Sequence, residues 1–435
     1  MPLRTVTLVN RLVHGGAERL AYQLVRDLDP ARFERTLCVS RADDPGHAAP
    51  GTEPARWIEE LRDDGVRVIE LRRRGRRDVA AWGPLLPELR RTDVLHAHMF
   101  GSNVWASTLG PLLGVPVVLS HEHAFAHTGG PFQAAIDRHL VARGSRAMIA
   151  PSALVRARMV GPDGVPADRV VVLPNGVETR MSTPGRDLRH ELGIPPDVLV
   201  VGSVGSLRAI KRFDVLIDAA DALRRRHPDV RVVIAGGGPE RAALDARIAE
   251  RGLTDTVRML GARDDVPDVL AACDVAVTCS DAEASPLSIM EYMGAGLPTV
   301  ATAVGGIPDV IGDGEHGVLV PRRDPAALAT AIGDLLDDPG RRIALGRAAA
   351  ARRRVEFDLA VMVRRVEELY ERVAQLAAQG ISILVVEQFA QAVLGVSTVA
   401  SIMLHGRITR TGPPAEIAEE LADAYLGGTA EPTPA

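Results

Sequence analysis

Lysine is almost absent from this chain. Lysine and arginine together number 51 among the 435 residues, and Lys211 is the only lysine. A P-loop requires a lysine between a glycine and a serine or threonine, whereas Lys211 stands between Ile210 and Arg212. A lysine that formed a Schiff base with a carbonyl substrate would have to be this same residue. The scarcity of lysine therefore excludes a P-loop NTPase and makes the position of Lys211 informative.

Cysteines, aromatic residues and long apolar runs are also scarce. The three cysteines, Cys38, Cys273 and Cys279, lack the spacing of a disulfide framework, which suits a reducing cytoplasm. Aromatic residues make up 3% of the chain and the net charge is −5, which argues against nucleic-acid binding. No run approaches the about 18 apolar residues of a membrane span. A strand is expected from the first residues, without a signal peptide, so we expect a cytoplasmic protein.

A basic cluster at residues 72–77 leaves two interpretations open. Its sequence is Arg-Arg-Arg-Gly-Arg-Arg. One interpretation is a peripheral contact with anionic lipid headgroups at the inner membrane face. The other, which we prefer, is a solvated loop.

Short β-rich runs alternate with amphipathic helical stretches along most of the chain, which is typical of parallel sheets covered by helices on both faces. The first series of expected strands comprises residues 5–9, 36–40, 66–71, 94–98, 115–120, 147–150 and 170–173. Turn residues then cluster at 174–176 and 181–186. The second series comprises residues 199–203, 231–235, 257–260, 275–278, 299–301 and 317–320. The pattern predicts an α/β protein with two doubly wound, Rossmann-like domains that face a cleft at their strand ends.

The same pattern suggests domain boundaries. We expect an N-terminal domain at residues 1–178 and a C-terminal domain at residues 179–354. Residues 341–374 have helical periodicity from Val355 to Leu369 and predict one long helix. Its part 355–376 is expected to return to the N-terminal domain. Residues 377–435 are expected to form a separate tail with a disordered end.

Lys211 closely follows an apolar run and a glycine-rich turn. The run at residues 198–205 contains Gly202 and ends at Gly205. A strand end followed by glycines is where α/β proteins bind anions. An ammonium is a compact point charge, unlike the wide guanidinium fork. We therefore interpret Lys211 as a phosphate-binding residue; the alternative is one leftover lysine on the surface of an arginine-biased chain.

Two glutamates surround a predicted helix start after the strand at 275–278. Pro286 fits the first helical position, which leaves Glu283 in the preceding loop and Glu291 inside the helix. Backbone N–H groups at that helix start are suited to a diphosphate, and the carboxylates are suited to sugar and ribose hydroxyls. The alternative is an acidic loop beside a solvated helix glutamate.

Two histidine pairs close predicted strands of the first series: His96 with His98, and His121 with His123. The i, i+2 spacing places both rings of a pair on one face of a strand. Neither pair has an evident carboxylate ligand set beside it, so we expect no metal site. A strand-end histidine is more often a satisfied hydrogen-bonding residue.

Five motifs in chain order together resemble the retaining glycosyltransferases of family 4, which have the GT-B fold. They are His-Gly-Gly-Ala-Glu-Arg at 14–19, Pro-Asn-Gly-Val at 174–177, Gly-Ser-Leu-Arg-Ala-Ile-Lys at 205–211, Ala-Gly-Gly-Gly-Pro-Glu at 235–240, and the glutamates at 283 and 291. The resemblance covers about residues 1–376. It implies transfer of a sugar from a UDP- or GDP-sugar, with retained configuration and without metal or other cofactor. The implied acceptor is a glycan, a lipid-linked molecule or a small molecule.

The resemblance implies that residues 1–178 form the acceptor-side domain and residues 179–354 the nucleotide-sugar-binding domain. It also implies roles for particular residues of the C-terminal domain. Lys211 and Arg208 would bind the donor diphosphate, Glu283 the donor sugar and Glu291 the ribose, with Ser288 beside them. Many members have arginine at the position of Ser206, and glycine at that of Ala284.

In the N-terminal half, Gly15 and Gly16 would let the backbone approach the phosphates. His123 would face the donor sugar, with His121 as the fallback and His98 on the acceptor side. The expected catalytic residues are thus His123, Glu283 and Lys211. Whether Glu283 is a covalent nucleophile, or the leaving diphosphate guides the acceptor to the same face, stays open. A nucleotide-sugar 2-epimerase and a non-catalytic interaction protein with this fold are the alternative functions.

The tail has a separate resemblance, to the C-terminal end of ATP-binding subunits of branched-chain amino-acid ABC transporters. It rests on residues 380–388, 405–408, 412–413 and 424–428. Phe389 replaces the usual asparagine after Glu387 and Gln388. The nucleotide-binding part of such a subunit has no counterpart here, so we interpret the tail as a fusion remnant or a gene-prediction artefact; a docking appendage is the alternative.

Overall fold

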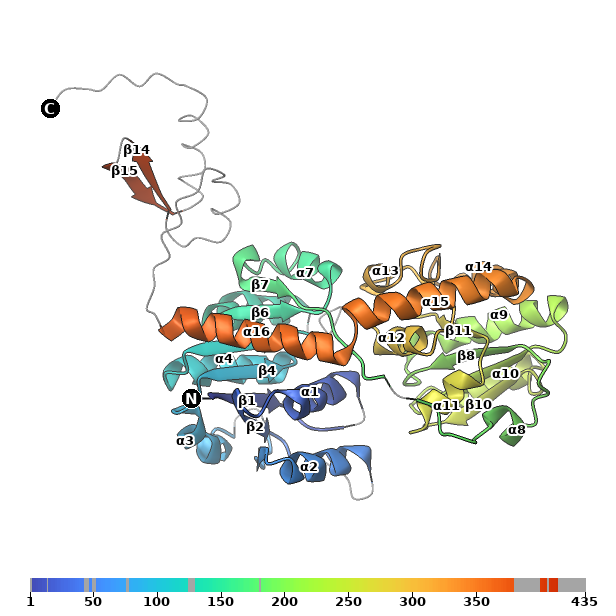
Figure 1. The fold of residues 1–435 in the computed structure, drawn as a ribbon, viewed down its shortest axis with the longest axis horizontal. Helices are drawn as coiled ribbons and strands as arrows, with labels where there is room; N and C mark the ends of the chain where they lie inside the picture. The colour runs from blue at the N-terminus through green and yellow to red at the C-terminus, as the bar shows by residue number, and fades with distance from the viewer. Residues whose placement is uncertain are drawn as a thin grey trace.

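The computed structural model describes residues 2–13, 15–42, 47–48, 52–75, 78–123, 130–179, 181–378, 400–404 and 407–413. Most of these residues form two α/β domains, each built on a parallel sheet with helices on both faces (Figure 1). The predicted fold class is therefore confirmed.

The N-terminal sheet has seven parallel strands in the order β3-β2-β1-β4-β5-β6-β7. The strands are β1 (Leu3–Val9), β2 (Phe33–Val39), β3 (Arg67–Glu70), β4 (Val94–His98), β5 (Val117–His121), β6 (Ala147–Ala150) and β7 (Val170–Val172). The helices are α1 (Gly16–Asp27), α2 (Glu53–Asp63), α3 (Leu86–Leu89), α4 (Phe100–Leu112), α5 (Gly130–Ile136), α6 (Ala142–Gly144) and α7 (Ala153–Val160). Two 3-10 helices, η1 (Ala80–Leu85) and η3 (Ala167–Arg169), and one π-helical segment, η2 (Asp137–Val141), lie between them. Every residue of β4 and β5 is buried, as expected for central strands covered on both faces.

The C-terminal sheet has six parallel strands in the order β10-β9-β8-β11-β12-β13. They are β8 (Val200–Val204), β9 (Arg231–Ala235), β10 (Val257–Gly261), β11 (Val275–Thr278), β12 (Thr299–Thr302) and β13 (Val318–Val320). The helices are α8 (Leu188–Glu191), α9 (Phe213–Arg226), α10 (Arg241–Glu250), α11 (Val266–Ala271), α12 (Leu287–Gly294), α13 (Ile307–Val310) and α14 (Pro325–Asp337), with the turn η4 (Ala209–Lys211). The strand order reverses beside β1 in one sheet and beside β8 in the other, and ligands bind at such switch points.

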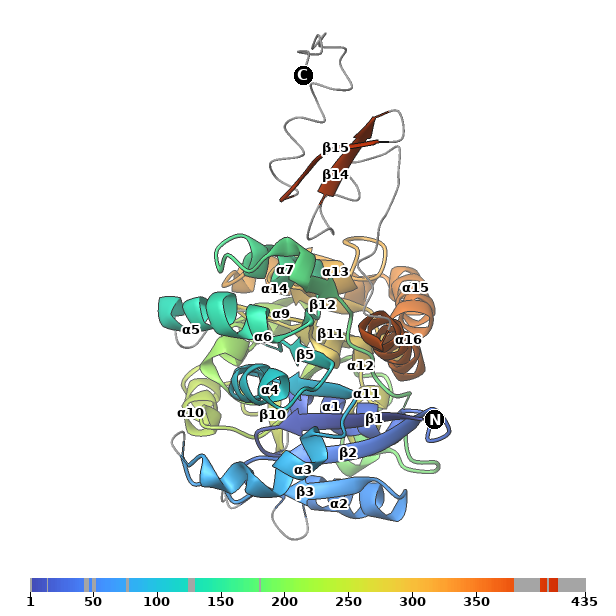
Figure 2. The ribbon, with the colours of Figure 1, turned by 90° about the vertical axis from the view of Figure 1, so that its left-hand side faces the viewer.

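The long helix predicted at residues 341–374 is in fact two helices, α15 (Pro339–Glu356) and α16 (Leu359–Ala378). Between them Phe357 is buried and the Asp358 carboxylate accepts the Ala360 N–H at 3.0 Å, which starts the second helix. Val355, which we placed on the apolar face, is 71% exposed. The break lets α15 follow the C-terminal domain while α16 packs on the N-terminal one. Figure 2 shows both helices on the same side of the molecule.

The apolar face of α16 completes the core of the N-terminal domain. Its side chains pack with those of α1, β2, β4 and β5. The α16 members of this cluster are Leu359, Met362, Val363, Val366, Tyr370 and Val373.

Two segments cross between the domains, and they are hydrogen-bonded to each other. The Val177 N–H donates to Phe357 O at 2.9 Å, and the Leu359 N–H donates to Val177 O at 3.0 Å. A Cβ at Gly176 would lie 2.7 Å from Asp358 O, so only glycine allows this approach. The buried Arg353 guanidinium donates to Val177 O. The connection between the domains is therefore a paired crossing rather than a single strand of chain.

In the tail, β14 (Ala400–Leu404) and β15 (Arg407–Gly412) form an antiparallel pair. The strand we expected at 381–386 and most residues behind the transporter resemblance lie outside the described residues.

Candidate active site

The predicted site residues follow the strands at the two switch points. Lys211 comes after β8 and Glu283 after β11, and these strands are neighbours in the C-terminal sheet. Gly15 comes after β1 and His98 ends β4, and these strands are neighbours in the N-terminal sheet. The parallel topology therefore gathers the residues by the carboxyl ends of their strands.

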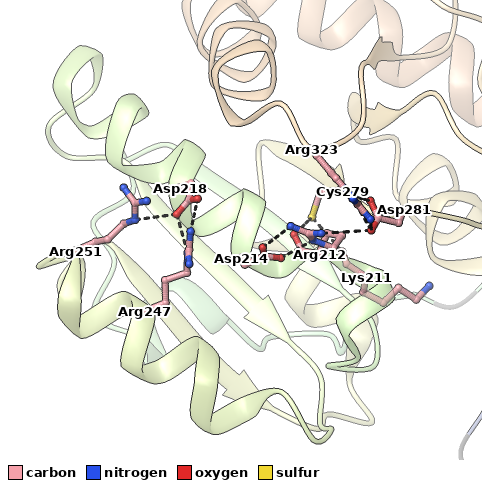
Figure 3. Close-up of polar contacts among 9 residues, drawn as sticks. All are labelled: Lys211, Arg212, Asp214, Asp218, Arg247, Arg251, Cys279, Asp281 and Arg323. Carbon is pink, nitrogen blue, oxygen red and sulfur yellow. Dashed lines mark hydrogen bonds and ion pairs between the residues drawn. The ribbon is translucent and has the colours of Figure 1, made fainter.

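The backbone at Lys211 is fixed by interactions that the sequence did not reveal. The buried Cys279 thiol donates to Lys211 O at 3.3 Å and to Arg212 O at 3.1 Å. Arg212 has a left-handed φ of 53° and pairs with Asp214 at 2.7 Å and Asp281 at 3.4 Å. Figure 3 shows the Lys211 side chain extending away from this cluster. The cluster thus directs the ammonium group while its own charges are neutralised.

A glycine contact fixes the loop in front of Lys211. A Cβ at Gly236 would lie 1.8 Å from Gly205 O, a distance that no side chain permits. The Leu207 N–H donates to Gly237 O at 2.9 Å. The glycine-rich segments at 205 and 236–238 are therefore packed backbone to backbone, which explains their composition.

Lys211 and Glu283 form an ion pair in the C-terminal domain. Lys211 Nζ lies 2.5 Å from Glu283 Oε1, and the Ser280 hydroxyl donates to the same oxygen at 2.6 Å. Gly305, with φ of 55°, would place a Cβ 1.8 Å from Glu283 O. The carboxylate is thus held in a tightly packed loop, and the ammonium already has an anionic partner.

Helix α12 begins one residue later than predicted, because Pro286 precedes its first residue and has an extended conformation (ψ 107°). Glu283 is in the loop and Glu291 in the helix, as expected from the sequence. Ser288 lies in the first turn of α12 and is partly exposed.

The N-terminal domain contacts the C-terminal site through α1. Arg19 Nη1 lies 2.8 Å from Glu291 Oε1, an ion pair between the domains. A Cβ at Gly16 would lie 3.2 Å from Leu287 Cδ1, so the starts of α1 and α12 are close. Burial raises the pKa of Glu18, and the nearby charges of Arg11 and Arg208 oppose that rise. The α1 end of the N-terminal domain thus faces the predicted donor-binding residues.

Two cavities, of about 210 and 240 Å³, border the Arg19–Glu291 pair. Glu291 lines the first, together with residues of the domain crossing such as Val177 and Arg353. Arg19 lines the second, with Tyr22 and Trp57. Lys211 lines neither of these cavities, and its side chain is bonded to Glu283 instead.

The four predicted histidines form one stack in the N-terminal domain. Ring centroids of His96 and His98 lie 4.3 Å apart, those of His98 and His121 5.1 Å, and those of His121 and His123 4.3 Å. His98 Nδ1 lies 3.0 Å from His123 Nε2. His98, which we expected on the acceptor side, is fully buried behind the partly exposed His123.

Burial keeps these imidazoles neutral. It holds the pKa values of His96, His98 and His121 well below the usual range, and neighbouring imidazoles add to the effect. Burial also lowers the pKa of His123, to about 4. The stack therefore offers lone pairs and N–H donors rather than positive charge.

Residues 76 and 77 of the basic cluster lie outside the described residues, and within 72–75 one arginine departs from the solvated loop that we preferred. Arg73 is 6% exposed and its guanidinium lies over the rings of Trp82 and Trp105, at 5.5 and 5.7 Å. Our preferred interpretation is wrong for this residue, because two aromatic rings from other parts of the sequence supply a stacking site.

The helices of the described residues include none with the length and apolar character of a membrane span.

Two family models match most of the chain. Residues 14–180 match Glycosyltransferase Family 4, and residues 186–352 match Glycosyl transferases group 1.

Curated relatives named D-inositol 3-phosphate glycosyltransferase are similar over part of the chain. The protein of Stackebrandtia nassauensis is 32% identical over 280 residues, which cover 59% of this chain and 63% of the relative. The protein of Corynebacterium aurimucosum is 37% identical over 218 residues, covering 47% of this chain and 51% of the relative. The chain thus spans less than two thirds of these relatives.

Solved structures share the fold at lower identity. HepE of Anabaena in complex with UDP and glucose has a TM-score of 0.73 at 21% identity, covering 85% of this chain and 100% of the neighbour. A glycosyltransferase of Rickettsia africae has a TM-score of 0.73 at 19% identity, and the match covers 86% of this chain and 98% of the neighbour. Because the family models together match more than half of the chain and the two-domain architecture agrees, the chain belongs to the glycosyltransferases with the GT-B fold.

Proposed function

We propose that this protein is a retaining glycosyltransferase that transfers a sugar from a UDP- or GDP-sugar to a glycan, lipid-linked or small-molecule acceptor. The observation that carries the proposal is the Lys211–Glu283 ion pair at the strand ends of the C-terminal switch point. One ammonium and one carboxylate, held 2.5 Å apart, match the two parts of a nucleotide sugar, an anionic diphosphate and a polyol.

The donor diphosphate would replace Glu283 as the partner of Lys211. Charge grows on the departing phosphate in the transition state, and a fixed ammonium aimed at it stabilises that charge. Arg208, which is exposed and near Glu18, would supply a second positive charge. The N-termini of α12 and of α1, with Gly15 and Gly16, would add backbone N–H groups. No step in this scheme requires a metal ion at the diphosphate.

The carboxylates would bind the hydroxyl groups of the donor. Glu283, released from Lys211, would accept hydrogen bonds from the donor sugar. Glu291, with Ser288 near it, would bind the ribose, and its ion pair with Arg19 would link ribose binding to closure of the domains.

His123 would face the reacting sugar as a neutral imidazole, and His98 would orient it through the 3.0 Å contact between their nitrogens. We favour transfer in which the leaving diphosphate guides the acceptor to the same face. The Ser280 hydroxyl donates to Glu283 Oε1 at 2.6 Å, a contact that remains when Lys211 is released and that supports a binding role for this carboxylate.

The acceptor is proposed only as a class. The relatives' name makes D-inositol 3-phosphate one compound to include among glycans, lipid-linked acceptors and small polyols.

The test is a panel of nucleotide sugars with these acceptors, followed by nuclear magnetic resonance of the product. We expect one UDP- or GDP-sugar to be consumed only with an acceptor and to give a product with the donor's anomeric configuration. Inverted configuration would contradict the retaining mechanism. Nucleotide release without an acceptor, with a 2-epimeric sugar as product, would instead identify an epimerase.

Metal independence has its own measurement. We expect UDP or GDP to bind equally well with and without EDTA. Binding that disappears in EDTA and returns with Mn²⁺ would show that a metal holds the diphosphate.

A further inference from the structure

The histidine stack is assembled by the register of two neighbouring strands. In the parallel pairing of β4 with β5, His98 lies opposite His121. His96 precedes His98 by two residues and so lies on the same face of the sheet. Each pair alone offers two imidazoles, but the register joins them into one group of three buried rings.

The three rings contain nitrogens with no hydrogen-bond partner among the described residues. These nitrogens are His96 Nε2, His98 Nε2, and both Nδ1 and Nε2 of His121. The residues are 1%, 0% and 1% exposed. Buried polar atoms nearly always have a partner, because an unsatisfied one costs about 1–3 kcal/mol. Four such atoms in one cluster indicate a ligand that bonds several of them.

Hydrogen bonds at the Nδ1 atoms of His96 and His98 leave the Nε2 atoms of these two rings available as metal ligands. His96 Nδ1 lies 2.6 Å from the Tyr370 hydroxyl of α16, and His98 Nδ1 lies 3.0 Å from His123 Nε2. With the proton on each Nδ1, the Nε2 atoms are free acceptors. Metal-binding histidines typically use their second nitrogen in this way, and the outer bond fixes the ring.

We propose that His96, His98 and His121 bind a divalent transition-metal ion of the Zn²⁺ class. One ligand atom from each ring lies within 4.8 Å of the others. Zinc–nitrogen bonds of about 2.1 Å in a tetrahedron place ligand nitrogens about 3.4 Å apart. The ring planes of His96 and His121 are stacked at 4°, so the rings would turn to bring their nitrogens onto one ion. Three imidazoles leave a fourth position for water or a small anion. We expected no metal because neither sequence pair had enough ligands; the strand register supplies the third.

A direct substrate role suits these residues less well. His96 and His121 are almost completely buried, whereas His123, partly exposed, is the member of the stack that a sugar can reach. A bound ion would act on the cleft through His98, which contacts His123. It would also tie α16 to the N-terminal sheet through Tyr370. This inference is independent of the proposed sugar transfer.

The test uses the full chain without an affinity tag. The protein is treated with EDTA, equilibrated separately with Zn²⁺, Co²⁺ and Ni²⁺, and dialysed into metal-free buffer before elemental analysis. We expect about one tightly held ion per chain for at least one metal, and Co²⁺ should give the visible absorption of a low-symmetry, four-coordinate site. Failure of all three ions to remain bound would overturn the proposal and leave water as the partner of these nitrogens.

Two variants locate the site. His121→Ala should lose the ion, whereas the double variant His139→Ala/His190→Ala, which removes two exposed histidines, should keep it. Retention by the first variant, or loss from the second, would contradict the assignment. Circular dichroism and the midpoint of urea unfolding report whether His121→Ala is folded.

Tyr370→Phe decides the question if His121→Ala does not fold. It leaves all three imidazoles in place and removes only the hydroxyl on His96 Nδ1. Loss of such an outer partner typically weakens metal binding about 10–100-fold. Unchanged affinity in this variant would show that His96 is not a ligand.

Discussion

The two domains prepare their switch points in opposite ways. The C-terminal one has charges that are already paired: Lys211 with Glu283, and Arg212 with Asp281. The N-terminal one has neutral, stacked imidazoles, and several of their nitrogens have no partner among the described residues. Both lie at carboxyl ends of central parallel strands, so the fold alone does not decide which chemistry a switch point carries.

The difference predicts how each region takes a ligand. An anion entering the C-terminal region exchanges one ionic partner for another, so the cost of freeing the ammonium is offset by the new contact. A ligand entering the N-terminal region meets nitrogens that have no partner among the described residues, so no contact between protein groups has to be broken. The C-terminal region is suited to a substrate that binds and dissociates in each turnover, and the N-terminal region to an ion that stays bound.

Removal of the ammonium should give the largest effect on activity. We expect Lys211→Ala to lower kcat about 10²–10³-fold, the loss typical of one group that stabilises a developing oxyanion. Lys211→Arg should also be poor, because the planar fork does not fit a site for a point charge. Steady-state turnover of the nucleotide sugar measures both. Arg225→Ala, exposed on α9, is the control. Near-wild-type turnover of Lys211→Arg would mean that codon bias alone placed this lysine.

Residues assigned to the donor sugar, which come from both domains, should differ in kinetics from the residue assigned to the ribose. Glu283→Gln and His123→Ala should lower kcat, because both side chains are assigned to the reacting sugar. Glu291→Gln should instead raise KM about tenfold, the value of one hydrogen bond to a charged group, with kcat nearly unchanged. Equal losses of kcat at constant KM in all three variants would refute this division.

The stability that Asp281 contributes to the charged C-terminal region should depend on pH. Arg323 and Arg212 lower the pKa of Asp281, against the opposing effect of burial. A lowered pKa in the folded state stabilises the protein above the unfolded pKa of about 3.9, and this contribution is lost as pH falls through the folded value.

Asp281→Asn should therefore reduce the free energy of unfolding at pH 7 by only about 1 kcal/mol, because Arg323 is largely exposed. The reduction should be smaller near pH 3, because the stabilising effect of the carboxylate is lost at low pH. Urea unfolding at both pH values measures the difference. Asp245→Asn, in an exposed pair on α10, is the matched control. A deficit that stays constant with pH would show that lost packing, rather than charge, is responsible.

The smallest effect should come from the tail. A chain that ends at residue 378 should keep its activity and melting temperature nearly intact, and neither chain should hydrolyse ATP. Truncation before residue 355 should give insoluble protein, because it removes the α16 side chains from the N-terminal core. Inactivity or aggregation of the 1–378 chain would make the tail an integral part of the fold.

The sequence predicted what depends on local pattern. Strand runs and glycine turns predicted both sheets, and the Pro286 context correctly placed Glu283 in a loop and Glu291 in a helix. The helix break at Phe357 and Asp358 was missed, because the residues there tolerate a helix and only packing against two domains favours a break.

Contacts between residues far apart in the chain could not be predicted from local sequence patterns. The Cys279 thiol that holds the Lys211 backbone and the Arg19–Glu291 pair both join residues about 70 or more positions apart. The facing of His98 and His121 depends on strand register, which is set when the sheet assembles. Two H-x-H segments at the ends of neighbouring predicted strands are the sequence signal that would have revealed the histidine stack.

The most direct test of the central claim, that the C-terminal region binds the donor diphosphate through Lys211, is calorimetric titration of EDTA-treated protein with UDP and GDP. We expect one nucleotide to bind the wild-type chain and Lys211→Ala to lose most of that affinity, while His121→Ala, which alters only the N-terminal stack, keeps it. Absence of binding by both nucleotides, or equal affinity in the wild-type and Lys211→Ala chains, would contradict the account.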